Sequence, residues 1–467
     1  MLEGLEISEI LLSEISFENR FDSEFYQKIF IKTDRYLKSK KGFEIGSKFK
    51  VTDGEHGSVV FRESGIKYLG AENIKNGYVD ITNIKYVDET VNKKNLRAEV
   101  KVGDLLISIK GTLGEIAIAE QWLLPANMSR DVAILKPLNG SNISSYFLSV
   151  FLMTRYGGIQ SQRGGSGGVV QMITLGRLRK FIVPIFSQKL DKTIEDLYLS
   201  SLSKRVQSKQ NYTQAENFLL EEIGLQDFEP SKEPVNIKSF AASFGTSGRL
   251  DAEYYQKKYE DIENKILNSP NGFTTINNEF EQISLKSKKE KIGFNYIEIG
   301  DVNVSDGSCE SNYVETKELP ANAKTLAKKG DILISKVRPY RGAVTLINFE
   351  KEDLIVSGAF TVLREKKKSI FSNEVLKVLL RTKEYKELLL KFNVGTSYPV
   401  IKDIDVLNLP IPKISKEIQE NITSKIQHSS KLKKQSEHLL EVAKRAVEIA
   451  IEENEAVALA FIKKETA

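Results

Sequence analysis

The chain repeats itself, and this internal repeat constrains the fold more than any other feature of the sequence. Gly103 and Asp104 precede an apolar run, and the same pair returns 227 residues later as Gly330 and Asp331. Four other segments return in the same order at shifts between 226 and 229 residues. A chance origin would scatter these shifts, so we infer a tandem duplication. The matching segments are residues 20–28 with 249–257, 65–69 with 293–297, 131–135 with 359–363, and 184–185 with 410–411.

Each repeat begins with a mixed section of strands and helices. Short β-branched runs broken by Gly, Asn and Asp, such as residues 105–109, predict strands and turns. These apolar runs are continuous, so we expect both faces of the strands to be buried. Between the strands we expect helices at residues 145–154 and 373–392. A proline then ends each section, at Pro184 and at Pro410.

A long polar helix is expected after each of these stops. Residues 188–223 and 416–452 contain no proline and are rich in Glu, Lys, Gln, Leu and Ala, which are good helix formers. Apolar residues recur at spacings of three and four in the second segment, which is typical of a coiled-coil seam, although Ser429 and Ser436 interrupt it. A helix of about 36 residues is about 54 Å long, and its narrow apolar face needs a partner.

The sequence therefore predicts an α+β fold with two similar domains, each followed by a long α-helix. We expect the two helices to pack on each other as an antiparallel coiled-coil spacer. The expected boundaries are residues 1–187 for the first domain, 188–226 for the central helix, 227–412 for the second domain and 413–467 for the C-terminal helix.

The composition argues against several classes of protein. Cys309 is the one cysteine, and the three histidines are far apart in the sequence, so neither a disulfide nor a thiolate or histidine metal site is expected. No run of about eighteen apolar residues occurs, which argues against a membrane span. Glu3 and Glu6 stand where a signal peptide needs basic residues, so we expect a cytoplasmic protein. The net charge of +5 is compatible with nucleic-acid binding but does not indicate it.

One run of the first repeat resembles a motif of a known family. Residues 103–117, Gly-Asp-Leu-Leu-Ile-Ser-Ile-Lys-Gly-Thr-Leu-Gly-Glu-Ile-Ala, resemble the central motif of target-recognition domains in the specificity (S) subunits of type I restriction–modification enzymes. The family's order of domain, helix, domain and helix covers nearly the whole chain. The second repeat departs from the motif, because residues 336–342 replace the Gly-Thr-x-Gly turn. This difference implies another loop and another base read by it. Further runs that resemble the same domain are residues 53–57, 65–69, 73–77 and 125–129.

The resemblance implies a protein with no catalytic activity of its own. Each domain would read one half of a split sequence in double-stranded DNA, and the helices would set the gap and dock methyltransferase (M) subunits. The M subunits would methylate adenine with S-adenosylmethionine, and restriction (R) subunits would translocate and cleave unmodified DNA. No cofactor is expected in this chain, since S-adenosylmethionine, ATP and Mg²⁺ would be bound by the partner subunits.

Base readout needs side chains that match the base edges, such as Arg or Lys for guanine and Asn or Gln for adenine. For each candidate, a solvated surface group or a phosphate contact is the alternative role. The glycine run at residues 163–168 lacks the lysine and spacing of a P-loop, so a loop that closes on DNA or a plain connection is favoured over a nucleotide site. The candidates are Lys67, Tyr68, Lys110, Thr112, Arg130, Arg163, Ser166, Gln171, Asn295, Tyr296, Lys336, Arg338, Tyr340, Arg341, Ser397 and Tyr398.

Other functions remain open at this point. The chain could be the recognition subunit of a different restriction system, in which methylase and nuclease share one partner chain. It could also be a scaffold with two protein-binding heads and no affinity for DNA. A self-contained adenine methyltransferase should show an Asn/Asp-Pro-Pro-aromatic tetrapeptide, and the nearest run, residues 268–271, does not match it. A metal-dependent nuclease is disfavoured but not excluded.

Overall fold

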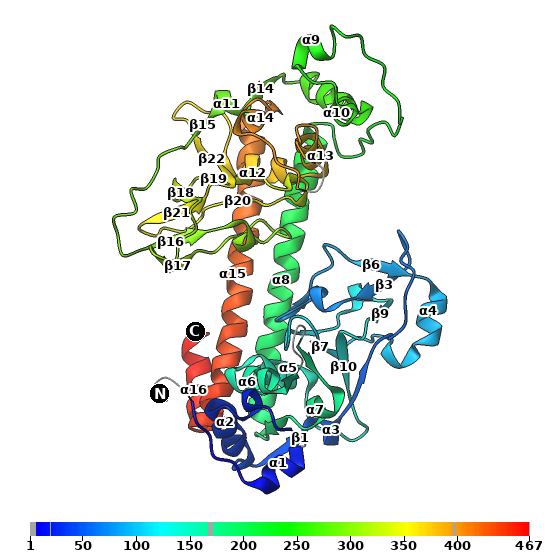
Figure 1. The fold of residues 1–467 in the computed structure, drawn as a ribbon, viewed down its shortest axis with the longest axis vertical. Helices are drawn as coiled ribbons and strands as arrows, with labels where there is room; N and C mark the ends of the chain where they lie inside the picture. The colour runs from blue at the N-terminus through cyan, green and yellow to red at the C-terminus, as the bar shows by residue number, and fades with distance from the viewer. Residues whose placement is uncertain (1–5, 19, 167–170, 396–397, 467) are drawn as a thin grey trace. The chain divides into compact units, whose positions relative to one another are not determined.

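The computed structural model describes residues 6–18, 20–166, 171–395 and 398–466, which form two compact units (Figure 1). Unit 1 comprises Met1–Val206 together with Leu432–Ala467, and unit 2 comprises Gln207–Lys431. The two long helices are α8 (Gln188–Glu222) and α15 (Lys416–Glu452), and each of them contributes one part to each unit. No helix in the described part of the chain is both long and apolar enough to cross a membrane.

Unit 1 is built on two sheets. The strand order of the antiparallel first sheet is β2 (Phe49–Asp53), β10 (Val132–Pro137), β7 (Leu105–Ser108) and β8 (Ile116–Ile118). The strand order of the second sheet is β6 (Lys85–Val87), β3 (Ile66–Leu69) and β9 (Ala126–Met128), with β3 and β9 parallel. All four residues of β7 are buried, as the continuous apolar run predicted. Leu105 and Ile107 pack in one core cluster with helices, whereas Leu106 packs in another cluster with Met128.

Unit 2 repeats this arrangement. Its first sheet has the order β15 (Phe280–Gln282), β22 (Phe360–Glu365), β19 (Ile332–Ser335) and β20 (Val344–Leu346). Its second sheet has the order β17 (Asn312–Glu315), β16 (Gly293–Ile297), β21 (Leu354–Ser357) and β18 (Ala323–Leu326), with β16 and β21 parallel. Since β19 follows β7 by 227 residues and β22 follows β10 by 228, the structure confirms the duplication that the sequence predicted.

Shorter elements complete each unit. The remaining strands are β1 (Gly42–Glu44), β4 (Ile74–Lys75), β5 (Tyr78–Val79), β11 (Gly165–Ser166), β12 (Met172–Ile173), β13 (Ile182–Pro184), β14 (Phe273–Thr275) and β23 (Pro410–Pro412). The short helices are α1 (Leu12–Glu18), α2 (Lys28–Lys38), α3 (Ile45–Lys48), α4 (Glu89–Lys94), α7 (Leu175–Arg179), α9 (Phe244–Ser247), α10 (Lys257–Leu267), α11 (Ile276–Glu279), α14 (Asp403–Leu407) and α16 (Glu455–Glu465).

A pair of buried helices follows the last strand of the first sheet in each unit. In unit 1 these are α5 (Ser145–Met153), at the position predicted from the sequence, and α6 (Arg155–Gly164). In unit 2 the single helix predicted over residues 373–392 is wrong. The structure has two helices there, α12 (Asn373–Arg381) and α13 (Lys383–Leu390). The break occurs because Thr382 is extended and its hydroxyl accepts the backbone N–H of Tyr385 at 3.4 Å, which caps α13.

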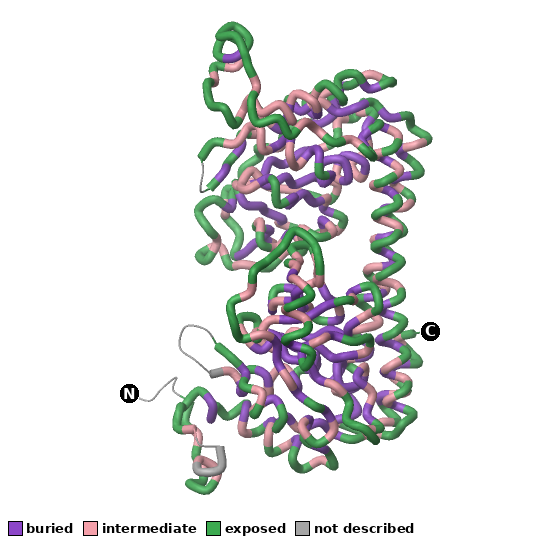
Figure 2. Tube along the Cα trace, turned by 90° about the vertical axis from the view of Figure 1, so that its right-hand side faces the viewer, coloured by how far each residue is buried: buried purple, intermediate pink, exposed green. Residues whose placement is uncertain are grey.

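The long helices pack on each other within each unit, and most of their buried residues lie on the faces turned toward the core (Figure 2). In unit 1, Ser201 lies opposite Ser436, and the hydroxyl of each donates to the backbone carbonyl of the other at 2.8 and 2.7 Å. In unit 2, Ser208 and Ser429 make the same reciprocal pair at 2.8 and 2.7 Å. Both pairs fit one antiparallel register, which confirms the predicted packing. The serines that interrupt the apolar pattern are therefore paired.

The repeated segment at residues 20–28 and 249–257 makes the same internal hydrogen bonds in both units. Arg20 donates to both carboxylate oxygens of Asp22 at 2.7 and 2.6 Å. The hydroxyl of Tyr26 donates to the backbone carbonyl of Arg20 at 3.0 Å. In unit 2 the hydroxyl of Tyr255 donates to the carbonyl of Arg249 at 3.1 Å. The acidic residues of this segment thus hold a turn.

Candidate nucleic-acid interface

The candidate site in unit 1 is the turn that follows β7. Ile109 donates its backbone N–H to the carbonyl of Asp131 at 2.9 Å, and its own carbonyl accepts the N–H of Ile173 at 2.8 Å. The next residue, Lys110, forms a backbone bridge with Met172. The residue that precedes β10 and the segment that follows the glycine run therefore meet at this turn.

The equivalent turn of unit 2 has the same hydrogen bonds. The backbone N–H of Lys336 donates to the carbonyl of Ala359 at 2.8 Å, and the carbonyl of Lys336 accepts the N–H of Ile401 at 3.0 Å. Val337 then bridges to Val400. Each of these residues lies 227 or 228 positions after its counterpart, so both units place the same backbone frame at the same place.

Each turn carries one lysine that is paired with an aspartate. In unit 1, Lys110 Nζ lies 3.6 Å from Asp131 Oδ1. In unit 2, Lys336 Nζ lies 3.1 Å from Asp403 Oδ1, and the hydroxyl of Thr361 donates to the same oxygen at 2.7 Å. Lys336 is therefore the more firmly held of the two lysines, and Lys110 has the looser ion pair.

The turn of unit 2 presents a cluster of basic and aromatic side chains. The guanidinium of Arg338 lies 5.3 Å from the ring centre of Tyr398. Tyr398 is 58% exposed and Tyr340 is 41% exposed, and Arg341 is also exposed. Exposed aromatic rings beside guanidinium groups can stack on bases, and the guanidinium groups can also bind phosphates. The structure thus brings these four predicted residues together.

The turn of unit 1 is smaller and less basic. Thr112, Arg130 and Gln171 are exposed. The ammonium group of Lys67 donates to the carbonyl of Trp122 at 3.4 Å. In unit 2, the side-chain amide of Asn295 donates to the carbonyl of Glu352 at 2.8 Å.

Both candidate tyrosines of the second sheets lie in the protein interior. Tyr68 and Tyr296 are each 6% exposed. Burial, with smaller contributions from Glu55 and Asp131, raises the pKa of Tyr68 to about 12, and burial also raises the pKa of Tyr296. These rings pack inside the second sheets, whereas the turns follow strands of the first sheets.

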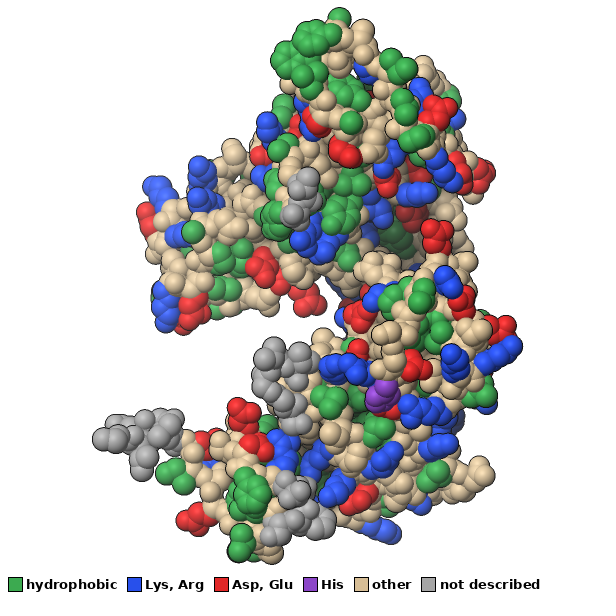
Figure 3. Space-filling view, turned by 45° about the vertical axis from the view of Figure 1, so that its right-hand side comes forward, with side chains coloured by type: hydrophobic (Ala, Val, Ile, Leu, Met, Phe, Trp, Pro, Cys, Tyr) green, Lys and Arg blue, Asp and Glu red, His purple; other side chains and the backbone are tan. Residues whose placement is uncertain are grey.

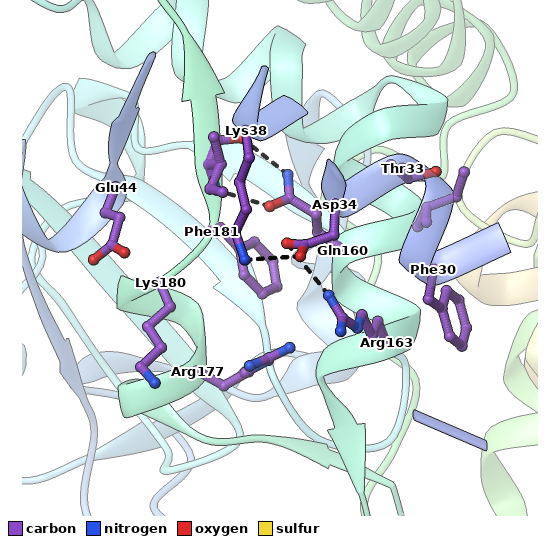
Figure 4. A pocket seen from close by; sticks show the side chains of 12 residues that line it. Phe30, Thr33, Asp34, Lys38, Glu44, Gln160, Arg163, Arg177, Lys180 and Phe181 are labelled. Atoms are coloured by element: carbon purple, nitrogen blue, oxygen red, sulfur yellow. Dashed lines mark hydrogen bonds and ion pairs between the residues drawn. The ribbon is translucent and has the colours of Figure 1, made fainter. Parts of the chain in front are cut away.

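Arg163 is also part of the interior, where it lines a small cavity in unit 1 (Figure 4). It is 9% exposed, and its guanidinium lies 4.3 Å from the ring centre of Phe25. Asp34 lies between Arg163 at 3.3 Å and Lys38 at 2.8 Å. The cavity has a volume of about 120 Å³. These contacts give Arg163 a structural role.

Part of the predicted site lies outside the described residues. This is true of Ser397, of the side chain of Ser166 and of the greater part of the glycine run. Within the described ranges, no group of three or more His, Cys, Asp and Glu side chains is placed to hold a metal ion.

The structure adds exposed aromatic residues that the sequence analysis did not select. Phe61 is 47% exposed, and the ammonium group of Lys85 lies 4.9 Å from its ring centre. Trp122 and Tyr313 are 41% and 64% exposed. An aromatic residue next to a basic one, as in Phe61 and Arg62, was the available signal. Across the face drawn in Figure 3, Lys and Arg side chains are interspersed with Asp and Glu, so charge alone does not mark the interface.

Comparison with known proteins supports the family resemblance. Residues 43–215 match the model of a family described as type I restriction modification DNA specificity domain. A stretch of 132 residues is 36% identical to the type I restriction enzyme HindI specificity subunit of Haemophilus influenzae, and covers 27% of this chain and 28% of that protein. The match thus spans little more than a quarter of the length of this relative.

Solved structures of S subunits are also similar to this chain. The S subunit of a type I restriction–modification system from M. genitalium aligns with 88% of this chain and 95% of its own length, at 13% identity and a TM-score of 0.45. The HsdS subunit from Thermoanaerobacter tengcongensis aligns with 89% of this chain and 97% of its own length, at 12% identity and a TM-score of 0.26.

Proposed function

We propose that this chain, whose residues 43–215 belong to the type I restriction–modification DNA specificity domains, is the DNA-recognition subunit of such an enzyme. The family match confirms the family predicted from the sequence. The single observation that carries the function is that unit 2 repeats the strand order and turn of the matched domain with different exposed side chains. Two similar frames with different surfaces suit a DNA target with two different halves.

The turns after β7 and β19 are the proposed contact surfaces. In unit 1 the surface consists of Lys110 and Thr112, joined by Arg130 and Gln171. In unit 2 it consists of Lys336 and the cluster of Arg338, Tyr340, Arg341 and Tyr398. Direct readout requires side chains that reach base edges, and the unit 2 cluster has the longer and more numerous donors. The remaining basic side chains of both surfaces fix the protein on the phosphate backbone.

The helices α8 and α15 are proposed to set the gap between the two half-sites. The paired serines support this role, because Ser201 with Ser436 and Ser208 with Ser429 occupy consecutive heptads in one register. Buried polar pairs of this kind specify register in helix pairs. A change in helix length is therefore expected to change the gap and to leave the half-sites as they are.

Catalysis is proposed to lie entirely in partner chains. M subunits would bind S-adenosylmethionine and methylate adenine, and R subunits would use ATP and Mg²⁺ for translocation and cleavage. A partner chain with fused methylase and nuclease would make the same demands on this chain. The purified complex distinguishes the two arrangements, because the first contains separate M and R chains and the second contains one partner.

A domain exchange tests the proposal. Residues 1–187 are replaced by the corresponding residues of a related specificity subunit with a different known target, and the methylated sequence is then determined. We expect one half-site to change and the other half-site and the gap to remain. If both half-sites change together, the assignment of one half-site to each unit is wrong. A reciprocal exchange of residues 227–412 is the matched control and should change the other half-site.

A further inference from the structure

The backbone bridges of Lys110 and Val337 are each followed by a turn residue that differs between the two repeats. Gly111 follows Lys110 in unit 1, and Arg338 follows Val337 in unit 2. Because the hydrogen bonds and the bridge that precede them match, Gly111 and Arg338 occupy the same position of the fold, and the turn of unit 2 has one residue more before the next strand. The two repeats therefore differ at this position in the side chain that the turn carries.

This backbone frame requires a positive φ angle. Gly111 has φ of 83°, which glycine adopts without strain. Arg338 has φ of 48° and ψ of 55°, the left-handed region that other residues rarely adopt. It also precedes Pro339, and a residue before proline is driven toward extended conformations. Glycine would satisfy this position better than arginine.

Strain of this kind is enriched at functional sites, although Lys289 and Asp353 also have positive φ, so the surroundings of Arg338 decide its role. In unit 1 a Cβ atom added to Gly111 would meet no atom within 4 Å, so the position opens into free space. In unit 2 the guanidinium of Arg338 lies 5.3 Å from the ring centre of Tyr398, which is itself 58% exposed. The backbone N–H of Arg338 donates to the carbonyl of Pro399 at 2.9 Å, which ties the turn to the segment that carries this ring.

We propose that Arg338 is a specificity-determining residue that reads a guanine in the half-site bound by unit 2. The inference rests on the proposed function and adds the base and the residue to it. A guanidinium donates two parallel hydrogen bonds to O6 and N7 of guanine, which is the commonest specific contact in the major groove. Tyr398 limits the orientations of the guanidinium before DNA binds, so less freedom is lost on binding. The half-site bound by unit 1 lacks this contact, because Gly111 has no side chain.

Two simpler roles make different predictions. If Arg338 stabilises the fold through its contact with Tyr398, its removal lowers stability. If it contacts a phosphate, its removal weakens binding to all sequences alike and reduces the salt dependence of binding. If it reads guanine, its removal relaxes one position of one half-site and leaves the rest of the target unchanged.

The experiment uses the full chain with its methyltransferase partner and compares wild type with Arg338→Gly and Arg338→Lys. Arg338→Gly removes both the side chain and the strain, and Arg338→Lys keeps the charge but not the paired donors. Lys289→Gly is the matched control, because Lys289 is another non-glycine residue of unit 2 with positive φ, at 54°. Urea unfolding and selection of duplexes from a random pool are measured for each protein.

For Arg338→Gly we expect an unfolding midpoint equal to or above that of wild type. We also expect preference for guanine at one position to fall by about tenfold or more. Arg338→Lys should lose the same preference, and Lys289→Gly should retain the wild-type target. A lower midpoint for Arg338→Gly, a uniform loss of affinity or an unchanged target would each overturn the proposal. A wild-type protein that selects no split target would instead contradict the proposed function itself.

Discussion

The substitution Ser208→Leu should have the opposite effect on stability in this protein from the effect that it has in an ordinary coiled coil. Leucine at a seam position normally stabilises a coiled coil, since burying its side chain contributes about 1.5–3 kcal/mol. In this protein the hydroxyl of Ser208 donates to the backbone carbonyl of Ser429 at 2.8 Å. The side chain is thus one hydroxyl away from the opposite backbone, which leaves no room for the additional carbon atoms of leucine. We therefore expect Ser208→Leu to destabilise the protein.

The magnitude follows from the contacts of the pair. Separating the helices to admit leucine costs about 1–3 kcal/mol. The two hydroxyl-to-carbonyl bonds of Ser208 and Ser429 are lost as well, at about 1 kcal/mol each. The free energy of unfolding should fall by about 3–5 kcal/mol in total. Ser208→Ala loses one of these bonds and gains about 0.5 kcal/mol of helix propensity, so it should change the free energy by less than about 1 kcal/mol.

The assay is urea unfolding of the full chain followed by far-ultraviolet circular dichroism. We expect the midpoint to be highest for wild type and Ser208→Ala and clearly lower for Ser208→Leu. Ser200→Leu, on the exposed side of α8, is the control and should leave the midpoint within the error of wild type. A midpoint for Ser208→Leu equal to or above that of Ser208→Ala would refute the close approach of the helices.

Three further predictions concern charge and backbone. Arg364→Met should lower the free energy of unfolding by about 3–5 kcal/mol, because it leaves the fully buried Asp331 without the guanidinium that binds both its oxygens at 2.7 and 2.8 Å; a loss below about 1 kcal/mol in thermal unfolding would contradict this. Burial, then the charges of Glu455 and a neighbouring glutamate, raises the pKa of Asp191 from 3.8 to about 7, so the folded state binds the extra proton and stability falls as the pH rises between these values. Asp191→Asn should therefore unfold at higher urea than wild type at pH 8, with the difference disappearing near pH 4, whereas equal midpoints at pH 8 would argue against a buried carboxyl. Gly111→Ala should cost about 1–2 kcal/mol despite the open space around it, because of its positive φ, and an unchanged melting temperature would show that the turn can relax.

Because of the duplication, most of the fold could be predicted from the sequence. Each apolar run occurs in two copies, such as those at β7 and β19, so each strand is predicted twice from independent residues. The long segments contain many helix formers and no proline, so their composition favours a helix over a strand or a loop. The break at Thr382 could not be predicted, because the apolar spacing continues through it. It depends on a single hydroxyl that caps the next helix, and this local bond competes with the helix pattern without leaving a periodic signal.

The residues of the candidate site were harder to predict, because the burial of a side chain depends on which strand covers which face of a sheet. Tyr68 follows Lys67, and the side-chain types of both residues suit DNA contacts, which made both of them candidates. The parallel partner β9 places Tyr68 in the interior. Arg163 stands beside a glycine run that indicated a loop, yet Phe25 and Asp34 bind it from a segment more than a hundred residues earlier. Such long-range partners leave no trace in local sequence.

The two units are proposed to read two halves of one DNA target. Selection of duplexes from a random pool by this chain with its co-purified methyltransferase tests it most directly. We expect a split motif with two different halves and one constant gap. A single contiguous motif, or a split motif with two identical halves, would contradict the account of two recognition frames with different surfaces.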